Sequence, residues 1–210
     1  MSALLPAAAA AVPLAGWSVH GLWLRRQLHN ARRDPLTGLR TRSAFERTAG
    51  RMLRRGPHAV IVIDLDGFKA VNDTFGHAAG DHALTAAADA LTETLEDDGR
   101  GGIAARLGGD EFAAIVPAPH DHAVPWLLRG LHGHLCAPLN YRGHTLTLGA
   151  SLGACLTAEL PTADLSLALR RADEAMYVAK RGGGGWLVAD GPTPSHRTSN
   201  GRRAGRRGAA

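Results

Sequence analysis

The sequence contains little cysteine and few aromatic residues. Only two of its 210 residues are cysteines, Cys136 and Cys155, and they form no CxxC pair. A disulfide framework and a cysteine zinc site are therefore excluded, and the composition suits a reducing compartment. Hydrophobic residues make up 45% of the chain and charged residues 20%. These values are typical of a folded globular protein, and they exclude wholesale disorder and a polytopic membrane protein.

Acidic residues are missing from both ends of the chain. Residues 1–33 contain four arginines and residues 195–210 contain five, and neither segment contains Asp or Glu. These arginines contribute nine positive charges, which is more than the net charge of +5 for the whole chain. The part of the chain between the two segments is therefore mildly acidic. The charge balance of the folded part therefore does not favour nucleic acid as a partner.

Residues 3–24 contain no Lys, Arg, Asp or Glu. A helix of this length measures about 33 Å, which is enough to cross the core of a bilayer. Arginines follow directly, and positive charge favours the cytoplasmic side. We therefore expect residues 1–33 to form a hydrophobic N-terminal helix and a basic linker that anchor the protein at the cytoplasmic face of the cell membrane. Seven alanines, two prolines and two glycines weaken the pattern, so an Ala-rich leader on a cytoplasmic protein is the alternative.

Helix and strand patterns alternate between residues 34 and 190, which we treat as one domain. Gly108-Gly109 separates two strand patterns and predicts a hairpin. The order of elements predicts an α/β fold of the ferredoxin-like or palm type, with a mixed central sheet flanked by helices. Residues 191–210 are rich in Pro, Ser, Gly and Arg and predict a disordered basic tail. Strands are expected at residues 59–65, 103–107, 111–116, 145–156 and 186–189, and helices at 41–54, 81–95, 125–135 and 163–181.

Acidic residues stand at the ends of two strand patterns. Asp64 and Asp66 end the first buried strand and share one of its faces, because side chains alternate along a strand. They could cap the next helix or bind a hard divalent cation. Asp110 and Glu111 follow the hairpin glycines, where acids are ordinarily only solvated. If the hairpin lies beside the first strand, Asp64, Asp66 and Asp110 converge, as carboxylates do in two-metal phosphoryl-transfer sites.

A glycine turn after the first strand opens a helix at Gly67-Phe68-Lys69. The free N–H groups at the start of a helix are suited to bind phosphate. A polar run follows, and its Asn and Asp side chains offer the donors and acceptors that could read a purine edge. In the structural alternative, the run is a loop and Asp81 caps the next helix. The run comprises Asn72, Asp73, His77 and Asp81.

Five ordered blocks of this sequence resemble the GGDEF family, the diguanylate cyclases. One block is the GGDEF string itself, which would be weak evidence alone. The other four occur in the family's order and at compatible spacing, so the resemblance is specific and covers roughly residues 34–189. The blocks are Asp34–Leu39 (DPLTGL), Asp64–Asp81 (DLDGFK to GHAAGD), Arg106–Phe112 (RLGGDEF), Ser151–Gly153 (SLG) and Ala172–Lys180 (ADEAMYVAK).

The resemblance implies condensation of two GTP molecules into cyclic di-GMP with release of pyrophosphate. Each protomer of a homodimer would bring one GTP. Magnesium, or manganese, would be held by Asp64, the backbone carbonyl of Leu65 and Asp110, and Asp110 and Glu111 would be the catalytic carboxylates. The family pattern also implies substrate contacts, with guanine near Asn72, His77 and Asp81, and phosphates near Gly67, Phe68, Lys69 and Lys180.

The sequence departs from the family pattern at several positions. The family's inhibitory product site, RxxD, falls here on Gly99 and Gly102, so no such site is expected. The position of a phosphate-binding arginine in the family is occupied here by Gly184. One phosphate contact is therefore expected to be lost, unless Arg181 supplies it instead. Thr41 stands in place of an asparagine. The alternatives are a catalytically weak or degenerate GGDEF module that acts as a GTP-binding regulatory domain, and a cyclase that makes another cyclic nucleotide.

Overall fold

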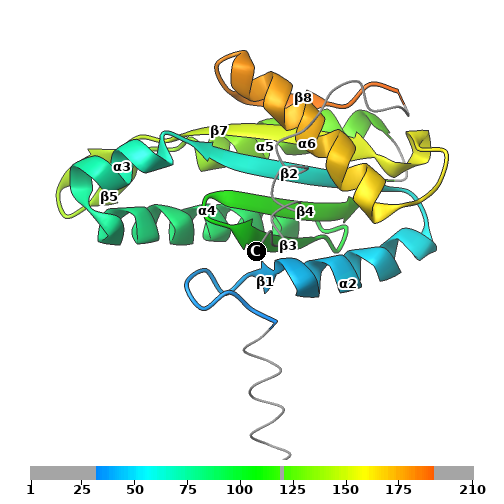
Figure 1. The fold of residues 1–210 in the computed structure, drawn as a ribbon, viewed down its shortest axis with the longest axis horizontal. Helices are drawn as coiled ribbons and strands as arrows, with labels where there is room; N and C mark the ends of the chain where they lie inside the picture. Colours follow the sequence, from blue (N-terminus) through cyan, green and yellow to red (C-terminus); the bar gives the residue numbers. More distant parts are fainter. Residues whose placement is uncertain (1–31, 119–120, 192–210) are drawn as a thin grey trace, which may run out of the picture.

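The computed structural model describes residues 32–118 and 121–191 of the chain. Six strands form one mixed sheet in the order β1-β3-β4-β2-β7-β8, with helices packed on both faces (Figure 1). The predicted α/β architecture, a mixed central sheet flanked by helices, is therefore confirmed. The strands are β1 (Arg40–Thr41), β2 (His58–Asp66), β3 (Ile103–Gly108), β4 (Glu111–Pro117), β7 (Gly149–Leu156) and β8 (Gly185–Val188), and a separate hairpin holds β5 (Leu139–Tyr141) and β6 (His144–Leu146).

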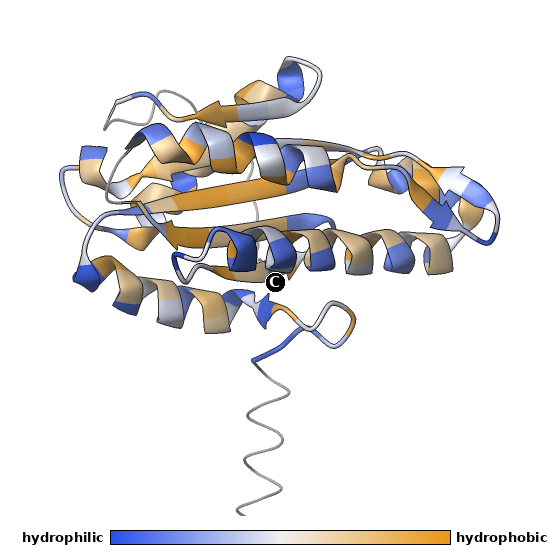
Figure 2. Cartoon of the chain, turned by 180° about the vertical axis from the view of Figure 1, so that it is seen from behind, coloured by the Kyte–Doolittle hydropathy of each residue, from blue (hydrophilic) through white to orange (hydrophobic). Residues whose placement is uncertain are grey.

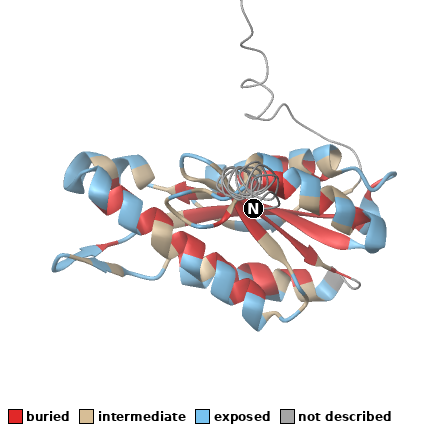
Figure 3. Cartoon of the chain, turned by 90° about the horizontal axis from the view of Figure 1, so that it is seen from below, coloured by how far each residue is buried: buried red, intermediate tan, exposed pale blue. Residues whose placement is uncertain are grey.

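Two hydrophobic clusters, one on each face of the sheet, form the core. One cluster contains residues of the two helices α4 and α5, and the other contains residues of α2 and α6. Figure 3 shows the buried strands between these helices. The helices are α2 (Arg42–Met52), α3 (Phe68–Phe75), α4 (His77–Asp97), α5 (Val124–Leu135) and α6 (Leu165–Arg181), with short 3-10 turns at Leu53–Arg55, Asp121–Ala123 and Thr157–Glu159.

Strand β2 runs through the centre of the sheet and is buried over most of its length. Figure 2 shows that the central strands are largely hydrophobic. Ile61 and Ile63 face the α4 and α5 cluster, whereas Val60 and Val62 face the α2 and α6 cluster. Because side chains alternate, Asp64 continues the series of Val60 and Val62. The carboxylates at the end of β2 therefore emerge on the face that α6 covers.

Gly153 on β7 allows α6 to lie directly against the sheet. A Cβ atom at this position would be 2.0 Å from the carbonyl oxygen of Ala172 and 2.2 Å from the nitrogen of Met176. No side chain fits between the two backbones at these distances. Gly153 therefore sets the depth at which the whole of α6 packs.

Two local expectations were wrong. Residues 145–156 do not form one strand, because His144–Leu146 pairs with β5 in a separate hairpin and the sheet strand β7 begins only at Gly149. Asp81 does not cap a helix. Gly76, with a φ of 83°, turns the chain so that α4 already begins at His77 and Asp81 lies within it. Both differences arise at tight turns that hydrophobic periodicity does not show.

The expected membrane anchor, residues 3–24, and the expected tail after Gly191 lie outside the described residues. Within the described ranges, no helix is both long enough and apolar enough to span a bilayer.

We predict that Gly153→Ala destabilises the protein, whereas Gly50→Ala does not. The first substitution forces α6 away from the sheet and should lower the free energy of unfolding by about 2–4 kcal/mol. Gly50 lies inside α2 and a Cβ there meets no atom within 4 Å, so alanine should add up to about 1 kcal/mol through helix propensity. Urea denaturation measures both changes. Equal effects of the two substitutions would contradict the close packing at Gly153.

Candidate active site at the end of β2

The hairpin between β3 and β4 lies beside the carboxyl end of β2. Asp64 pairs with Glu111 in the antiparallel register of β2 and β4. The backbone N–H of Leu65 donates a hydrogen bond to the carbonyl oxygen of Asp110 at 3.3 Å. The hairpin therefore brings Asp110 next to the end of β2, beside Asp64.

Lys180, near the end of α6, bridges the two aspartates of β2. Its Nζ donates a hydrogen bond to Oδ1 of Asp64 and lies 3.5 Å from Oδ1 of Asp66. The hydroxyl of Ser151 on β7 donates to Oδ2 of Asp66 at 2.7 Å. Asp66 thus connects β2 with β7 and α6, a role that the sequence did not reveal, because only the fold brings residues 66, 151 and 180 together.

The electrostatics of this cluster favour a bound cation. Burial raises the pKa of Asp64, and the negative charges of Asp110 and Asp66 raise it further, against the lowering effect of Lys180. Burial alone would lower the pKa of Lys180, but the hydrogen bond and charge of Asp64, with Asp66, hold that pKa above its ordinary value. Lys180 contacts Asp64 and Asp66, and the charge of Asp110 also acts on Asp64, so the carboxylates here outnumber the one ammonium group.

A divalent cation fits the donor atoms at this place. Carboxylate and backbone carbonyl oxygens are the ligands that magnesium prefers, and magnesium commonly uses one or two carboxylates together with substrate phosphates. Across the described ranges, no three acidic, histidine or cysteine side chains already converge as a complete metal site. The carboxylates of Asp64 and Asp110 therefore suit a cation that arrives with a phosphorylated substrate.

The polar residues of α3 and α4 follow directly after β2. Gly67, with a φ of 80°, ends the strand and α3 begins at Phe68, which is followed by exposed Lys69. A Cβ at Gly80 would lie 2.1 Å from Oδ1 of Asn72, so the missing side chain makes room for that amide. Gly80 belongs to the GHAAGD block of the sequence, but its packing against Asn72 is visible only in the fold.

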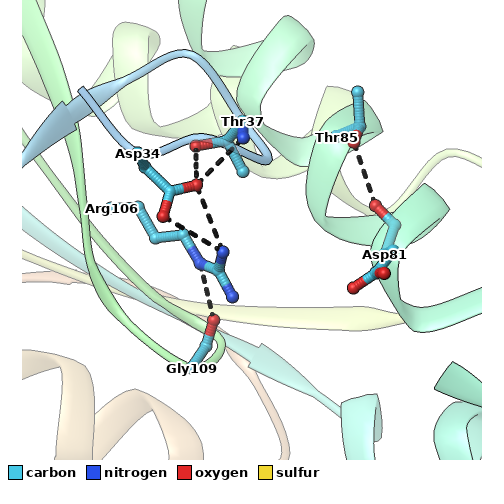
Figure 4. Close-up of polar contacts among 6 residues, drawn as sticks. All are labelled: Asp34, Thr37, Asp81, Thr85, Arg106 and Gly109. Carbon is cyan, nitrogen blue, oxygen red and sulfur yellow. Dashed lines mark hydrogen bonds and ion pairs between the residues drawn. The ribbon is translucent and has the colours of Figure 1, made fainter. Parts of the chain in front are cut away.

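His77 and Asp81 both lie in the first turns of α4. His77 is the first residue of the helix, and Asp81 lies one turn further along. Both side chains are exposed, so they are accessible to a ligand that lies against α3 and α4. Figure 4 shows Asp81 on its helix, apart from the contacts that hold the hairpin.

A turn at residues 34–38 holds the hairpin in place (Figure 4). Arg106 donates from Nη1 to Oδ1 of Asp34 at 3.2 Å and from Nε to the carbonyl oxygen of Gly109 at 2.9 Å. Asp34 also accepts from the backbone N–H and the hydroxyl of Thr37. Although burial alone would raise the pKa of Asp34, the bonds from Thr37 and Arg106 hold that pKa below its ordinary value. The DPLTGL block marks this turn in the sequence, whereas its contact with the hairpin becomes visible only in the fold.

Glu111 lies toward the start of α2. Its Oε2 is 3.7 Å from Nη2 of Arg42, whose Nε donates to the carbonyl oxygen of Leu107 at 3.4 Å. A hollow of about 540 Å³ separates the hairpin from this end of α2, lined among others by Gly108 and Gly109. The structure thus places Asp110 toward Asp64 and Glu111 toward Arg42.

The departures from the family pattern have structural counterparts. Gly184 has a φ of 99°, and a Cβ there would be 3.3 Å from Oδ2 of Asp66. Arg181 does not replace the family's arginine, because its guanidinium lies over the ring of Tyr177, 6.0 Å from the centroid. Lys180 is therefore the cation that the end of α6 supplies to the described site.

Of the two positions where the family's product site falls, Gly102 is closed by packing, whereas a Cβ at Gly99 would meet no atom within 4 Å. A Cβ at Gly102 would be 2.6 Å from Cγ1 of Val116. Arg100, the basic residue nearest to the two glycines, donates from Nε to Asp98 at 2.7 Å and from Nη1 to the carbonyl oxygen of Pro117 at 3.3 Å. Its guanidinium is therefore already engaged.

Comparison with known proteins identifies close relatives. A family model described as diguanylate cyclase, GGDEF domain, matches residues 31–185. The chain is 48% identical over 174 residues to an uncharacterized 19.3 kDa protein of Streptomyces ambofaciens, covering 82% of this chain and 91% of that protein. It is 37% identical over 166 residues to the diguanylate cyclase DgcP of Pseudomonas aeruginosa, covering 76% of this chain but 24% of DgcP. The chain thus spans about a quarter of the length of that cyclase.

Solved structures agree with the fold. The coiled coil and GGDEF domain of DgcB from Caulobacter crescentus, in complex with c-di-GMP, matches with a TM-score of 0.75 and 27% identity over 90% of this chain and 100% of that one. The GGDEF domain of TpbB, or YfiN, from Pseudomonas aeruginosa matches with a TM-score of 0.70 and 34% identity over 75% of this chain and 94% of that one.

We predict that Asp34→Asn destabilises the protein at neutral pH but not in acid. The lowered pKa of Asp34 means that its stabilising effect is present above the pKa of the unfolded chain and is lost as pH falls through the folded value. The loss at pH 7 should be about 1–2 kcal/mol, the scale of a few partly buried bonds to a carboxylate. Urea denaturation over a pH series measures it, with the exposed Asp89→Asn as control. A difference independent of pH would contradict this role.

Proposed function

The chain belongs to the diguanylate cyclase GGDEF-domain family, and we propose that it condenses two molecules of GTP into cyclic di-GMP. The position of Asp110 beside Asp64 carries this proposal, because it gathers carboxylates at the place where phosphates would bind. We interpret the domain as a palm-type fold, because a strand, a hairpin and a helix surround these carboxylates. The domain would comprise residues 34–190, between an N-terminal segment, 1–33, and a tail, 191–210.

GTP would lie across the end of β2. Asn72 and Asp81 would hydrogen-bond the guanine edge, with His77 close by, because these side chains lie on α3 and the first turns of α4. The N–H groups after Gly67 and at Phe68 would bind phosphate oxygens at the start of α3. The ammonium groups of Lys69 and Lys180 would bind the phosphates as well. The proposed substrate contacts are therefore Gly67, Phe68, Lys69, Asn72, His77, Asp81 and Lys180.

A divalent cation would be held by Asp64, the backbone carbonyl of Leu65 and Asp110. Magnesium or manganese there would neutralise charge on the phosphates and make the attacking hydroxyl more acidic. Diguanylate cyclases with GGDEF domains generally use a divalent metal. Glu111 would act beside Asp110, where its contact with Arg42 couples the catalytic hairpin to α2.

The reaction would need two protomers, each carrying one GTP. The 3′-hydroxyl oxygen of each ribose attacks the α-phosphorus of the other GTP, forming a phosphodiester bond. The bond between the α- and β-phosphates breaks, pyrophosphate leaves, and the hydroxyl proton passes to solvent. The residues of each chain hold their own GTP in line with the partner's ribose, so a homodimer forms the complete reaction site.

Lys180 would change partners when GTP binds. Its ammonium group forms ion pairs with Asp64 and Asp66. With GTP bound, Asp64 would instead hold the divalent cation and the ammonium group of Lys180 would bind a phosphate. Asp66 and Ser151 would keep the lysine within reach, in compensation for the family's arginine that is absent at Gly184.

We also propose that residues 3–24 tether the domain to the cytoplasmic face of the membrane. The support is the uncharged run followed by arginines in the sequence. Catalysis as proposed above does not depend on this tether.

The test of the proposed function is Asp110→Ala, with exposed Asp89→Ala as control. We predict that the first substitution lowers formation of cyclic di-GMP from GTP and Mg²⁺ by about a hundredfold or more, the scale of losing one key electrostatic group. The melting temperature should stay close to that of the unmodified protein, because Asp110 is partly exposed at a turn. Mass spectrometry identifies the product.

Two outcomes would contradict the proposed reaction. A folded Asp110→Ala variant with full activity would remove Asp110 from the site. An unmodified protein that binds GTP but forms no cyclic product would instead be a regulatory GTP-binding module.

We predict that cyclic di-GMP inhibits this enzyme weakly. Gly102 has no room for a side chain, and Arg100 is engaged by Asp98, so strong charge-assisted contacts to the product are missing. One exposed contact is worth about 1 kcal/mol, which is far too little for micromolar binding. Initial rates at saturating GTP with added micromolar product should therefore remain nearly unchanged. Strong non-competitive inhibition would show that another surface binds the product.

A further inference from the structure

A groove lined with arginines runs along α2. It has a volume of about 390 Å³ and is formed by one side of α2 together with β1 and the segment before it. Figure 1 shows β1 and α2 next to each other at the start of the described chain. Four of its six lining residues are arginines: the groove is lined by Arg32, Arg40, Ala44, Thr48, Arg47 and Arg51.

Among the residues that the structure describes, no ion pair joins an arginine of this groove to an acidic side chain, whereas arginines elsewhere in the fold have such partners. Arg106 meets Asp34, and Arg100 meets Asp98. None of the residues that line the groove is acidic. Arg51 donates from Nη2 to the hydroxyl of Thr48 at 3.4 Å, which is a contact with an uncharged group.

The positive charges in the groove repel one another. Burial lowers the pKa of Arg40, and the charges of Arg33 and Arg51 lower it further. A cluster of like charges on a folded domain costs free energy that a bound anion would recover. The domain as a whole is mildly acidic, so the groove is a local exception to its charge balance.

The shape and lining of the groove define the ligand. Guanidinium groups bind phosphate oxygens in a bidentate manner, and several of them together suit adjacent phosphates. The lining contains no aromatic residue on which a base could stack. A concave groove of this size suits a small soluble ligand, whereas a lipid surface is flat.

We propose that the arginine groove binds a soluble anion that carries two or more adjacent phosphates. Pyrophosphate, a nucleoside triphosphate and short polyphosphate share this chemistry, and the phosphates are the part that the groove recognises. The groove shares no lining residue with the proposed GTP contacts at the end of β2. The proposed binding therefore does not depend on the proposed reaction.

The experiment is isothermal titration of the full chain with tripolyphosphate in buffer without divalent cations, at constant ionic strength. The groove variant is Arg47→Gln/Arg51→Gln. The matched control is Arg54→Gln/Arg55→Gln, which removes the same charge from exposed residues just after α2 and outside the groove. A third variant, Lys180→Gln, reports binding at the end of β2.

We expect the groove variant to weaken binding by about tenfold or more, as the loss of charge-assisted phosphate contacts implies. The control and Lys180→Gln should bind within about twofold of the unmodified chain, since neither changes the groove. The groove variant should also keep its melting temperature and its rate of cyclic di-GMP formation.

Three results would overturn the proposal. The unmodified chain could fail to bind tripolyphosphate, or both double variants could weaken binding equally, which would indicate general charge attraction. The third result comes from sedimentation with phosphatidylglycerol vesicles. Vesicle binding that needs Arg47 and Arg51, without binding of tripolyphosphate, would assign the groove to lipid head groups.

Discussion

The register between β2 and β4 is the constraint on which the candidate site depends. It sets Asp64 opposite Glu111, and the Leu65 N–H group then meets the carbonyl oxygen of Asp110. The hydrogen bonds of an antiparallel pair fix this alignment, and a slip of one residue would turn the β2 carboxylates to the other face. The contact between Arg106 and Asp34 holds the hairpin from its other side.

This register brings carboxylates together at the end of β2, and a lysine on α6 partly balances their negative charge. Lys180 reaches Asp64 and Asp66 because Gly153 lets α6 lie directly on β7. A packing requirement in the core thus determines where the ammonium group stands. The ammonium group of Lys180 offsets the repulsion between Asp64 and Asp66, and the carboxylates of the proposed site would accept a divalent cation together with phosphates.

Much of this architecture was predictable from the sequence, and the failures have physical causes. The Val- and Ile-rich run of β2, the glycine pair of the hairpin and the apolar face of α6 predicted their elements, because each is a local pattern. The roles of Asp66, Gly80 and the turn at Asp34 were not predictable, since each depends on contacts between segments far apart in the chain. The split of residues 145–156 depends on a turn and a pairing that periodicity does not report.

The most direct test of the account is a manganese titration followed by electron paramagnetic resonance, with the full chain and a non-hydrolysable GTP analogue. The account predicts that manganese binds with the nucleotide, and that Asp64→Asn and Asp110→Ala each weaken this binding by about tenfold or more, because each removes a carboxylate ligand. Unchanged manganese affinity in both folded variants would contradict the claim that β2 and the hairpin together form a cation site.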